Sequence, residues 1–153
     1  MTIVSFQPAS PLASDGAALA QALGRAQVGK ESLICVTGPA ALTAMLWLAR
    51  RGYDRAVLAT GSAARLGQPA DALLIPHACS VEQLSGILAK GAWLGEGGAL
   101  IVQIAEARDD LAGDGFRRLL SDLGFSSLHR LTDRGRTVWI ARRAGSDGYE
   151  KAA

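Results

Sequence analysis

The stretch from Asp71 to Ile104 constrains the fold of this chain more than any other part of the sequence. It holds two short aliphatic runs, 72–75 and 99–104, on either side of a helix-like segment and a Gly97-Gly98 pair. Uninterrupted aliphatic runs of this length are typical of strands that are buried on both faces of a parallel sheet. Ser80 is suited to cap the intervening helix. The stretch therefore predicts a strand, a helix, a tight turn and a second strand.

The rest of the chain continues this alternation. We expect helices at about 14–26, 40–51 and 115–123, and strands at about 32–37, 55–59, 127–131 and 137–142. The last two strands are joined by the hairpin signal at 132–136.

This order of elements predicts an α/β fold. We expect a three-layer sandwich in which helices cover both faces of a mostly parallel, Rossmann-like sheet, with a C-terminal antiparallel hairpin. The strand at 32–37 is predicted to be central. We expect the α/β domain to span 14–143, between an irregular N-terminal arm at 1–13 and a flexible tail at 144–153.

Composition excludes several classes of protein. A chain of 153 residues suits one domain, and its 16 basic and 14 acidic residues leave a net charge of only +2. That balance argues against a nucleic-acid partner and against an anionic membrane surface. Two cysteines, no signal-peptide pattern and no apolar run of roughly 18 residues favour a cytoplasmic protein outside the membrane.

The apolar fraction bears on assembly. Apolar residues make up 49% of the chain and charged residues only 20%. One small domain should have difficulty covering so much apolar surface, so we expect a homodimer or a hetero-partner protein.

Several segments together resemble class I S-adenosylmethionine-dependent methyltransferases. LICVTGPAALTAMLWLARRGY is similar to that family's first strand, cofactor loop and first helix, and AVLAT is similar to its second strand. ADALLIPHA resembles the fourth strand and the loop after it, and WLGEGGALIVQI resembles the entry to the fifth strand. LLSDLGFSSLHRL with RTVWIARR resembles the closing helix and reversed hairpin. The resemblance covers about 32–142 and implies the methyltransferase-like fold.

The resemblance also implies a cofactor site at the carboxyl ends of the strands, where ligands of such sheets bind. The positions that correspond to the family's cofactor contacts are Thr37, Gly38, Pro39, Ala40, Ala59, Thr60 and Pro76.

This chain departs from the family at those positions. The family's loop carries an acidic residue and then G-x-G-x-G. Here Val36 replaces the acidic residue, and Gly38 alone of the three glycines remains. The acid expected at the end of the second strand is replaced by Ala59 or Thr60, and the family's third strand is missing or vestigial. We therefore expect weak or no binding of S-adenosylmethionine.

Two residues near the expected site are candidates for catalysis. His77 follows a buried strand and could act as a general base, although a histidine bonded within its loop explains it as well. Glu106 follows the fifth strand on the same side, where a solvated carboxylate is the simpler interpretation. Cys35 and Cys79 are expected to be core residues, and Asp71 is expected to be structural.

Two functions follow from these observations. The first is a methyltransferase-like domain with a degenerate cofactor site. The alternative is an active small-molecule methyltransferase, because methyl transfer needs mainly positioning and at most one base. No metal site is expected.

Overall fold

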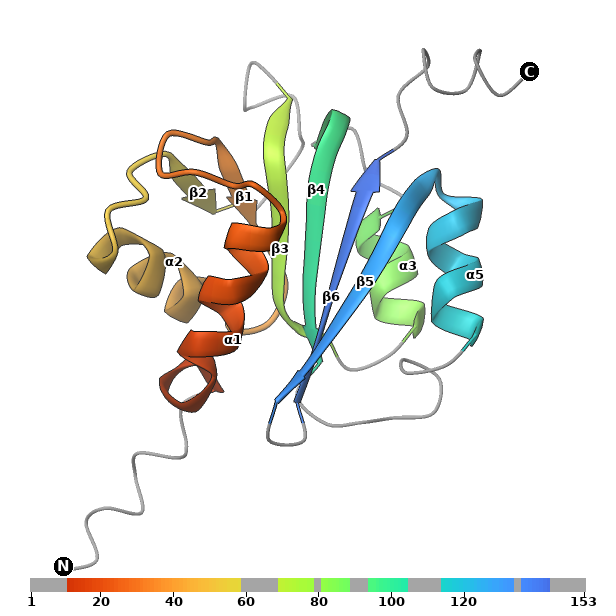
Figure 1. Cartoon of the computed structure of the whole chain (residues 1–153), viewed down its shortest axis with the longest axis horizontal. Helices are drawn as coiled ribbons and strands as arrows, with labels where there is room; N and C mark the ends of the chain where they lie inside the picture. Colours follow the sequence, from red (N-terminus) through yellow and green to blue (C-terminus); the bar gives the residue numbers. More distant parts are fainter. Residues whose placement is uncertain are drawn as a thin grey trace, which may run out of the picture.

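The structure is a computed structural model that describes residues 11–58, 69–78, 81–88, 94–104, 114–133 and 136–143. Figure 1 shows its elements in chain order. The helices are α1 (Pro11–Arg25), α2 (Ala41–Arg50), α3 (Val81–Leu88) and α5 (Asp114–Asp122). The strands are β1 (Ile34–Val36), β2 (Ala56–Leu58), β3 (Ala70–Ala78), β4 (Leu94–Ile104), β5 (Phe125–Asp133) and β6 (Arg136–Arg143).

The strands form one six-stranded sheet in the order β2-β1-β3-β4-β6-β5. β2, β1, β3 and β4 pair in parallel, and β6 is antiparallel to both β4 and β5. The predicted mixed α/β sheet with a C-terminal antiparallel hairpin is therefore confirmed. The predicted central position of the first strand is wrong: β1 has a neighbour on each side, but the longer β3 and β4 hold the middle of the sheet.

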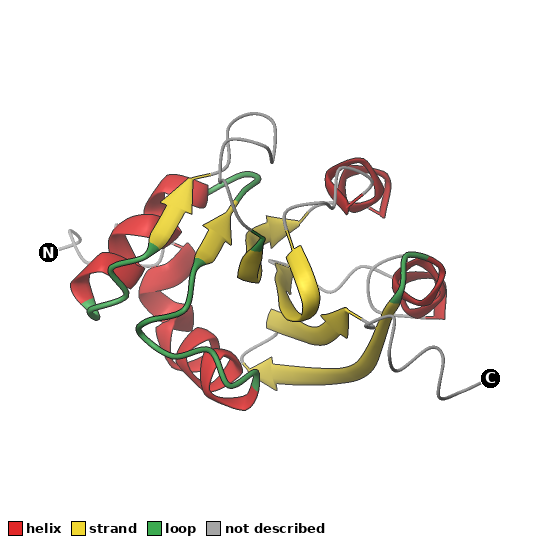
Figure 2. Ribbon diagram, turned by 90° about the horizontal axis from the view of Figure 1, so that it is seen from above, coloured by secondary structure: helices red, strands yellow, loops and turns green. Residues whose placement is uncertain are grey.

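Helices cover both faces of the sheet, α1 and α2 on one and α3 and α5 on the other (Figure 2). Each face has its own apolar core, because successive side chains of a strand point to opposite faces. In β1, Ile34 and Val36 pack beneath α1 and α2, whereas Cys35 packs on the side of α3 and α5. All three are fully buried, as strands between two helical layers require.

Two predicted boundaries within the sheet are wrong. Pro76 and His77 lie inside β3 rather than in a loop after it, and the Gly97-Gly98 pair lies inside β4 rather than in a turn before it. Both places coincide with a shift in the β3–β4 register. An irregular pairing tolerates a proline without an N–H, and it takes up a glycine with positive φ such as Gly97, at 75°.

The first helix also differs from its prediction. α1 begins at Pro11, three residues before the expected cap at Ser14. Proline is well tolerated in the first turn of a helix, since its missing N–H would have no partner there. The predicted tail, residues 1–10 of the predicted arm, and the tip of the hairpin at 134–135 lie outside the described residues. None of the described helices is long and apolar enough to cross a membrane.

Candidate functional site

The loop that joins β1 to α2 lies at the carboxyl edge of the sheet. The N–H of Thr37 donates a hydrogen bond to the Leu74 carbonyl of β3 at 3.1 Å, so the loop begins as a continuation of the sheet. Gly38 then turns the chain with φ +90°, and the N–H of Ala41 donates to the Gly38 carbonyl at 3.2 Å. The turn places the N-terminus of α2 directly after the strand.

Ala40 caps α2 in a left-handed conformation, with φ 64° and ψ 15°, and gives the helix no side-chain cap. A residue with a Cβ atom is disfavoured in this region, which glycine enters freely. In the resemblance described above, Ala40 occupies the position of the second glycine. The loop thus keeps a backbone conformation that suits glycine although the residue is alanine.

Gly38 faces residues of β3 and α3. A Cβ atom built on Gly38 would lie 3.4 Å from Ile75 Cγ2, 3.7 Å from Ile87 Cδ1 and 4.0 Å from the His77 carbonyl oxygen. The loop, the end of β3 and α3 therefore meet at this glycine, and the loop lies beside His77, as expected of strands that end at one edge. The space that a side chain at this position would need is bordered by two isoleucines.

The other residues of the predicted site differ in how far they are exposed to solvent. Thr37 and Pro76 are buried, His77 and Ala40 are half-buried, and Pro39 is exposed. Val36, at the position of the family's acid, is fully buried in the core beneath α1 and α2. Ala59, Thr60 and Glu106 lie outside the described residues, so their assignment to this edge stays a prediction.

Two further predictions concern buried or structural residues. Cys35 is fully buried, and burial raises the pKa of its thiol from 9.0 to about 11. A neutral buried thiol is a core residue and a poor nucleophile, as expected. The Oδ2 atom of Asp71 accepts a hydrogen bond from the Leu33 N–H at 2.9 Å, which ties the start of β3 to the start of β1 and gives Asp71 the structural role expected of it. Cys79 lies outside the described residues.

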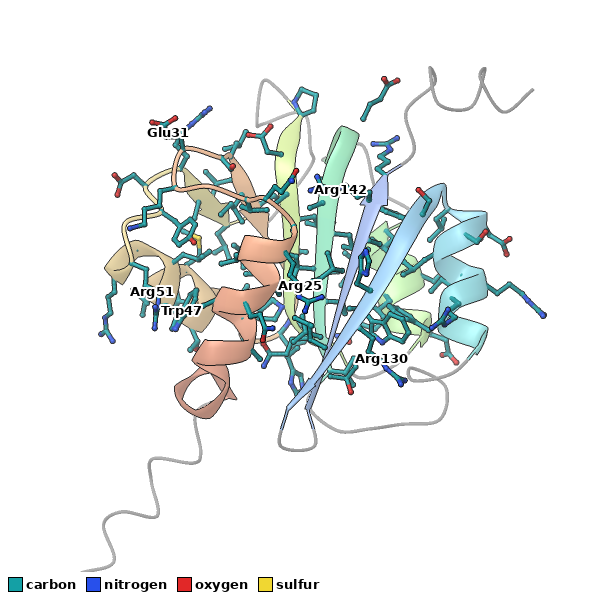
Figure 3. The ribbon with its side chains drawn as sticks, in the orientation of Figure 1. Arg25, Glu31, Trp47, Arg51, Arg130 and Arg142 are labelled. Atoms are coloured by element: carbon teal, nitrogen blue, oxygen red, sulfur yellow. The ribbon has the colours of Figure 1, made fainter. Side chains whose placement is uncertain are left out.

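The tryptophans that the structure describes pack rather than line the candidate site. Trp139 is buried against Phe116, with 5.0 Å between the ring centroids. Trp47 is half-buried on α2 and carries the Arg51 guanidinium 4.4 Å from its ring centroid (Figure 3).

One buried polar residue was not selected from the sequence. Gln103 is fully buried near the carboxyl end of β4. The signal was present, because a single amide interrupts the aliphatic run LIVQI. Within the described residues, no group of three or more His, Cys, Asp or Glu side chains is placed to bind a metal ion.

A cavity lies elsewhere, at the opposite, amino edge of the sheet, where its lining includes Asp71 and Arg142. It is separate from the candidate cofactor loop, whose residues do not line it.

Comparison with known proteins places this arrangement among known folds. No protein-family model and no curated protein sequence matches the chain. Solved structures do match. Human N-acetylserotonin methyltransferase in complex with S-adenosylmethionine superposes with a TM-score of 0.56 at 14% identity, covering 92% of this chain and 55% of that chain. The ribosomal protein L11 methylase from Lactobacillus delbrueckii subsp. bulgaricus gives 0.56 at 15% identity, covering 82% and 76%.

An O-methyltransferase family protein from Burkholderia thailandensis matches with a TM-score of 0.55 at 12% identity, covering 94% of this chain and 61% of that one. The chain thus spans little more than half of two of these three neighbours. Its fold is a Rossmann-like α/β sandwich closed by an antiparallel hairpin. It is the fold of the S-adenosylmethionine-dependent methyltransferases, as the sequence resemblance predicted.

Proposed function

We propose that this chain is a methyltransferase-like domain whose degenerate cofactor site binds S-adenosylmethionine weakly or not at all. The observation that carries the proposal is the apolar surroundings of Gly38, where a Cβ atom would stand in van der Waals contact with Ile75 and Ile87. In a cofactor loop, glycine lets the backbone amides approach the ligand. Here the side of Gly38 that a Cβ atom would occupy faces apolar side chains of β3 and α3.

The missing acidic residue at position 36 supports the same proposal. Val36 is fully buried among apolar side chains, and a carboxylate there would need a partner to offset its lost hydration. A cofactor bound in the usual way would lose charge-assisted hydrogen bonds that are worth roughly 1.5–3 kcal/mol each. Two such losses weaken binding by about a hundredfold or more. The described residues of the loop therefore do not fit the cofactor well.

One observation favours the alternative, an active methyltransferase with a small-molecule substrate. Ala40 keeps the left-handed conformation of a glycine-rich loop, and the half-buried His77 lies beside that loop. Under this alternative the site positions the substrate and His77 accepts a proton from the attacking group.

Thermal unfolding with S-adenosylmethionine and with S-adenosylhomocysteine separates the two proposals. A ligand at 100 times its Kd stabilises a protein by about 2.7 kcal/mol, which raises the Tm by several degrees. We expect no saturable rise at concentrations that saturate active methyltransferases. A saturable rise that is lost in a Gly38→Leu variant, in which the cofactor loop is altered, would favour the alternative. In that case His77→Gln should abolish methyl transfer and leave the rise in Tm intact.

A further inference from the structure

The cavity at the amino edge of the sheet is large enough for a small molecule. Its volume is about 570 Å³, within the usual range of ligand sites. Segments that are far apart in the sequence meet around it: the connection after α1, the start of β3, the start of β4 and Arg142 near the end of β6. We call it the amino-edge cavity. Figure 1 shows the edge concerned, where β3 and β4 begin.

A bulge in β4 lines the cavity. Ala70 pairs with Leu94 and Ala72 pairs with Ala99, so a step of two residues along β3 is matched by a step of five along β4. The four residues of β4 between these pairs, 95–98, face a single residue of β3 and line the cavity. Glycine is favoured at two of these positions: a Cβ atom on Gly98 would lie 2.6 Å from Leu94 Cδ1, and Gly97 has a positive φ of 75°. Bulges of this kind often occur beside functional sites.

A second departure from regular backbone lies across the cavity. Gln27 has a left-handed conformation with φ 61°, and it lines the cavity together with Gly97. This conformation closes the C-terminus of α1, because the N–H groups of Gln27 and Val28 donate to the carbonyl oxygens of Gly24, at 3.1 Å, and of Leu23, at 2.9 Å. The capped end of the helix therefore forms one wall of the cavity.

The charges that line the cavity are of both signs. The half-buried Arg142 donates hydrogen bonds to the carbonyl oxygens of Gly97, at 3.0 Å, and of Ala26. Both acceptors are neutral, and a guanidinium has five N–H groups, so Arg142 keeps positive charge and further donors for a ligand. Asp71 lines the same cavity and uses Oδ2 for the Leu33 N–H, which leaves Oδ1 as an acceptor. Figure 3 shows the position of Arg142 beside β4.

We propose that the amino-edge cavity binds a free amino acid. The ligand's α-carboxylate contacts the Arg142 guanidinium, and its α-ammonium contacts the Asp71 carboxylate, so both charges of the zwitterion meet an opposite charge. Glu96 adds a second carboxylate to the lining, which then carries one positive and two negative side chains. That balance disfavours phosphate and other multiply charged anions, and it favours a basic amino acid over an acidic one.

Binding is tested by thermal unfolding and isothermal titration of the full chain with L-lysine, L-serine and L-glutamate. Acetate and ethylamine, each with one of the two charges, serve as half-ligands. We expect a saturable rise in Tm that is largest for L-lysine and smallest for L-glutamate, and no rise with either half-ligand at the same concentration.

Three variants locate the site. Asp71→Asn keeps an oxygen acceptor for the Leu33 N–H but removes the charge, and it should weaken amino-acid binding about tenfold, because the ligand loses its charge-assisted hydrogen bond to this exposed carboxylate. Arg142→Gln should weaken amino-acid binding similarly. If Arg142→Gln does not fold, the result for Asp71→Asn decides. Glu82→Gln removes an exposed carboxylate from α3, outside the cavity, and should bind like the wild type. The proposal is overturned if no amino acid raises the Tm, or if Asp71→Asn binds as tightly as the wild type.

Discussion

Replacing Ala40 by glycine should stabilise this protein, although glycine normally destabilises helices. Ala40 is the N-cap of α2 and adopts φ 64° and ψ 15°. An alanine in this left-handed conformation costs roughly 1–2 kcal/mol relative to its usual backbone regions. Glycine avoids that cost but loses more conformational entropy on folding, by about 0.4–1 kcal/mol. The difference predicts that Ala40→Gly raises the free energy of unfolding by about 0.5–1 kcal/mol.

Urea denaturation followed by circular dichroism measures this change. The midpoint should rise while the slope m stays constant, because the surface exposed on unfolding is unchanged. The matched control is Ala20→Gly, in the middle of α1, where the same substitution should cost about 0.5–1 kcal/mol. The opposite signs isolate the effect of the left-handed conformation. If Ala40→Gly instead lowers stability as Ala20→Gly does, the left-handed conformation of Ala40 does not strain the loop.

Three further predictions follow from the core and the surface. Burial raises the pKa of Cys35 to about 11 in the folded chain, so stability should fall as the pH rises from about 9 towards 11, and a Cys35→Ala variant should lack this part of the pH dependence. Phe116→Ala removes a fully buried ring from its contact with Trp139 and should cost about 3–5 kcal/mol in urea denaturation, whereas Phe116→Leu should cost clearly less. Leu42, Leu46 and Leu58 are 64%, 53% and 40% exposed, so we expect the protein to self-associate. Light scattering should detect this association, and a Leu42→Ser/Leu46→Ser variant should reduce it. A monomeric wild type at high concentration would contradict the prediction.

The fold could be predicted from the sequence because the relevant signals are local. Aliphatic runs such as 99–104 report burial between two helical layers, and glycines such as Gly52 and Gly124 mark the ends of helices. The details that failed depend on contacts between strands. The register shifts that include Pro76 and Gly97 within β3 and β4 arise from the pairing of these two strands, and the local sequence predicts a loop and a turn for the same residues.

The candidate site was predicted only in part. The adjacency of Gly38 and His77 follows from the strand order that the resemblance implies. The position of Ile75 and Ile87 beside Gly38 could not be inferred from a single glycine in the sequence. The left-handed conformation of Ala40 was also hidden, because alanine is a residue that normally favours helix. The amino-edge cavity escaped sequence analysis because its lining residues come from four separate segments.

Isothermal titration of S-adenosylmethionine into the full chain tests the central claim most directly. Because this cofactor itself carries an amino-acid group, the titration is repeated with Asp71→Asn, which alters the amino-edge cavity and leaves the Gly38 loop unchanged. We expect no detectable binding at the carboxyl edge, or a Kd well above the micromolar range. A low-micromolar Kd that persists in Asp71→Asn would contradict it and would identify the Gly38 loop as a working cofactor site.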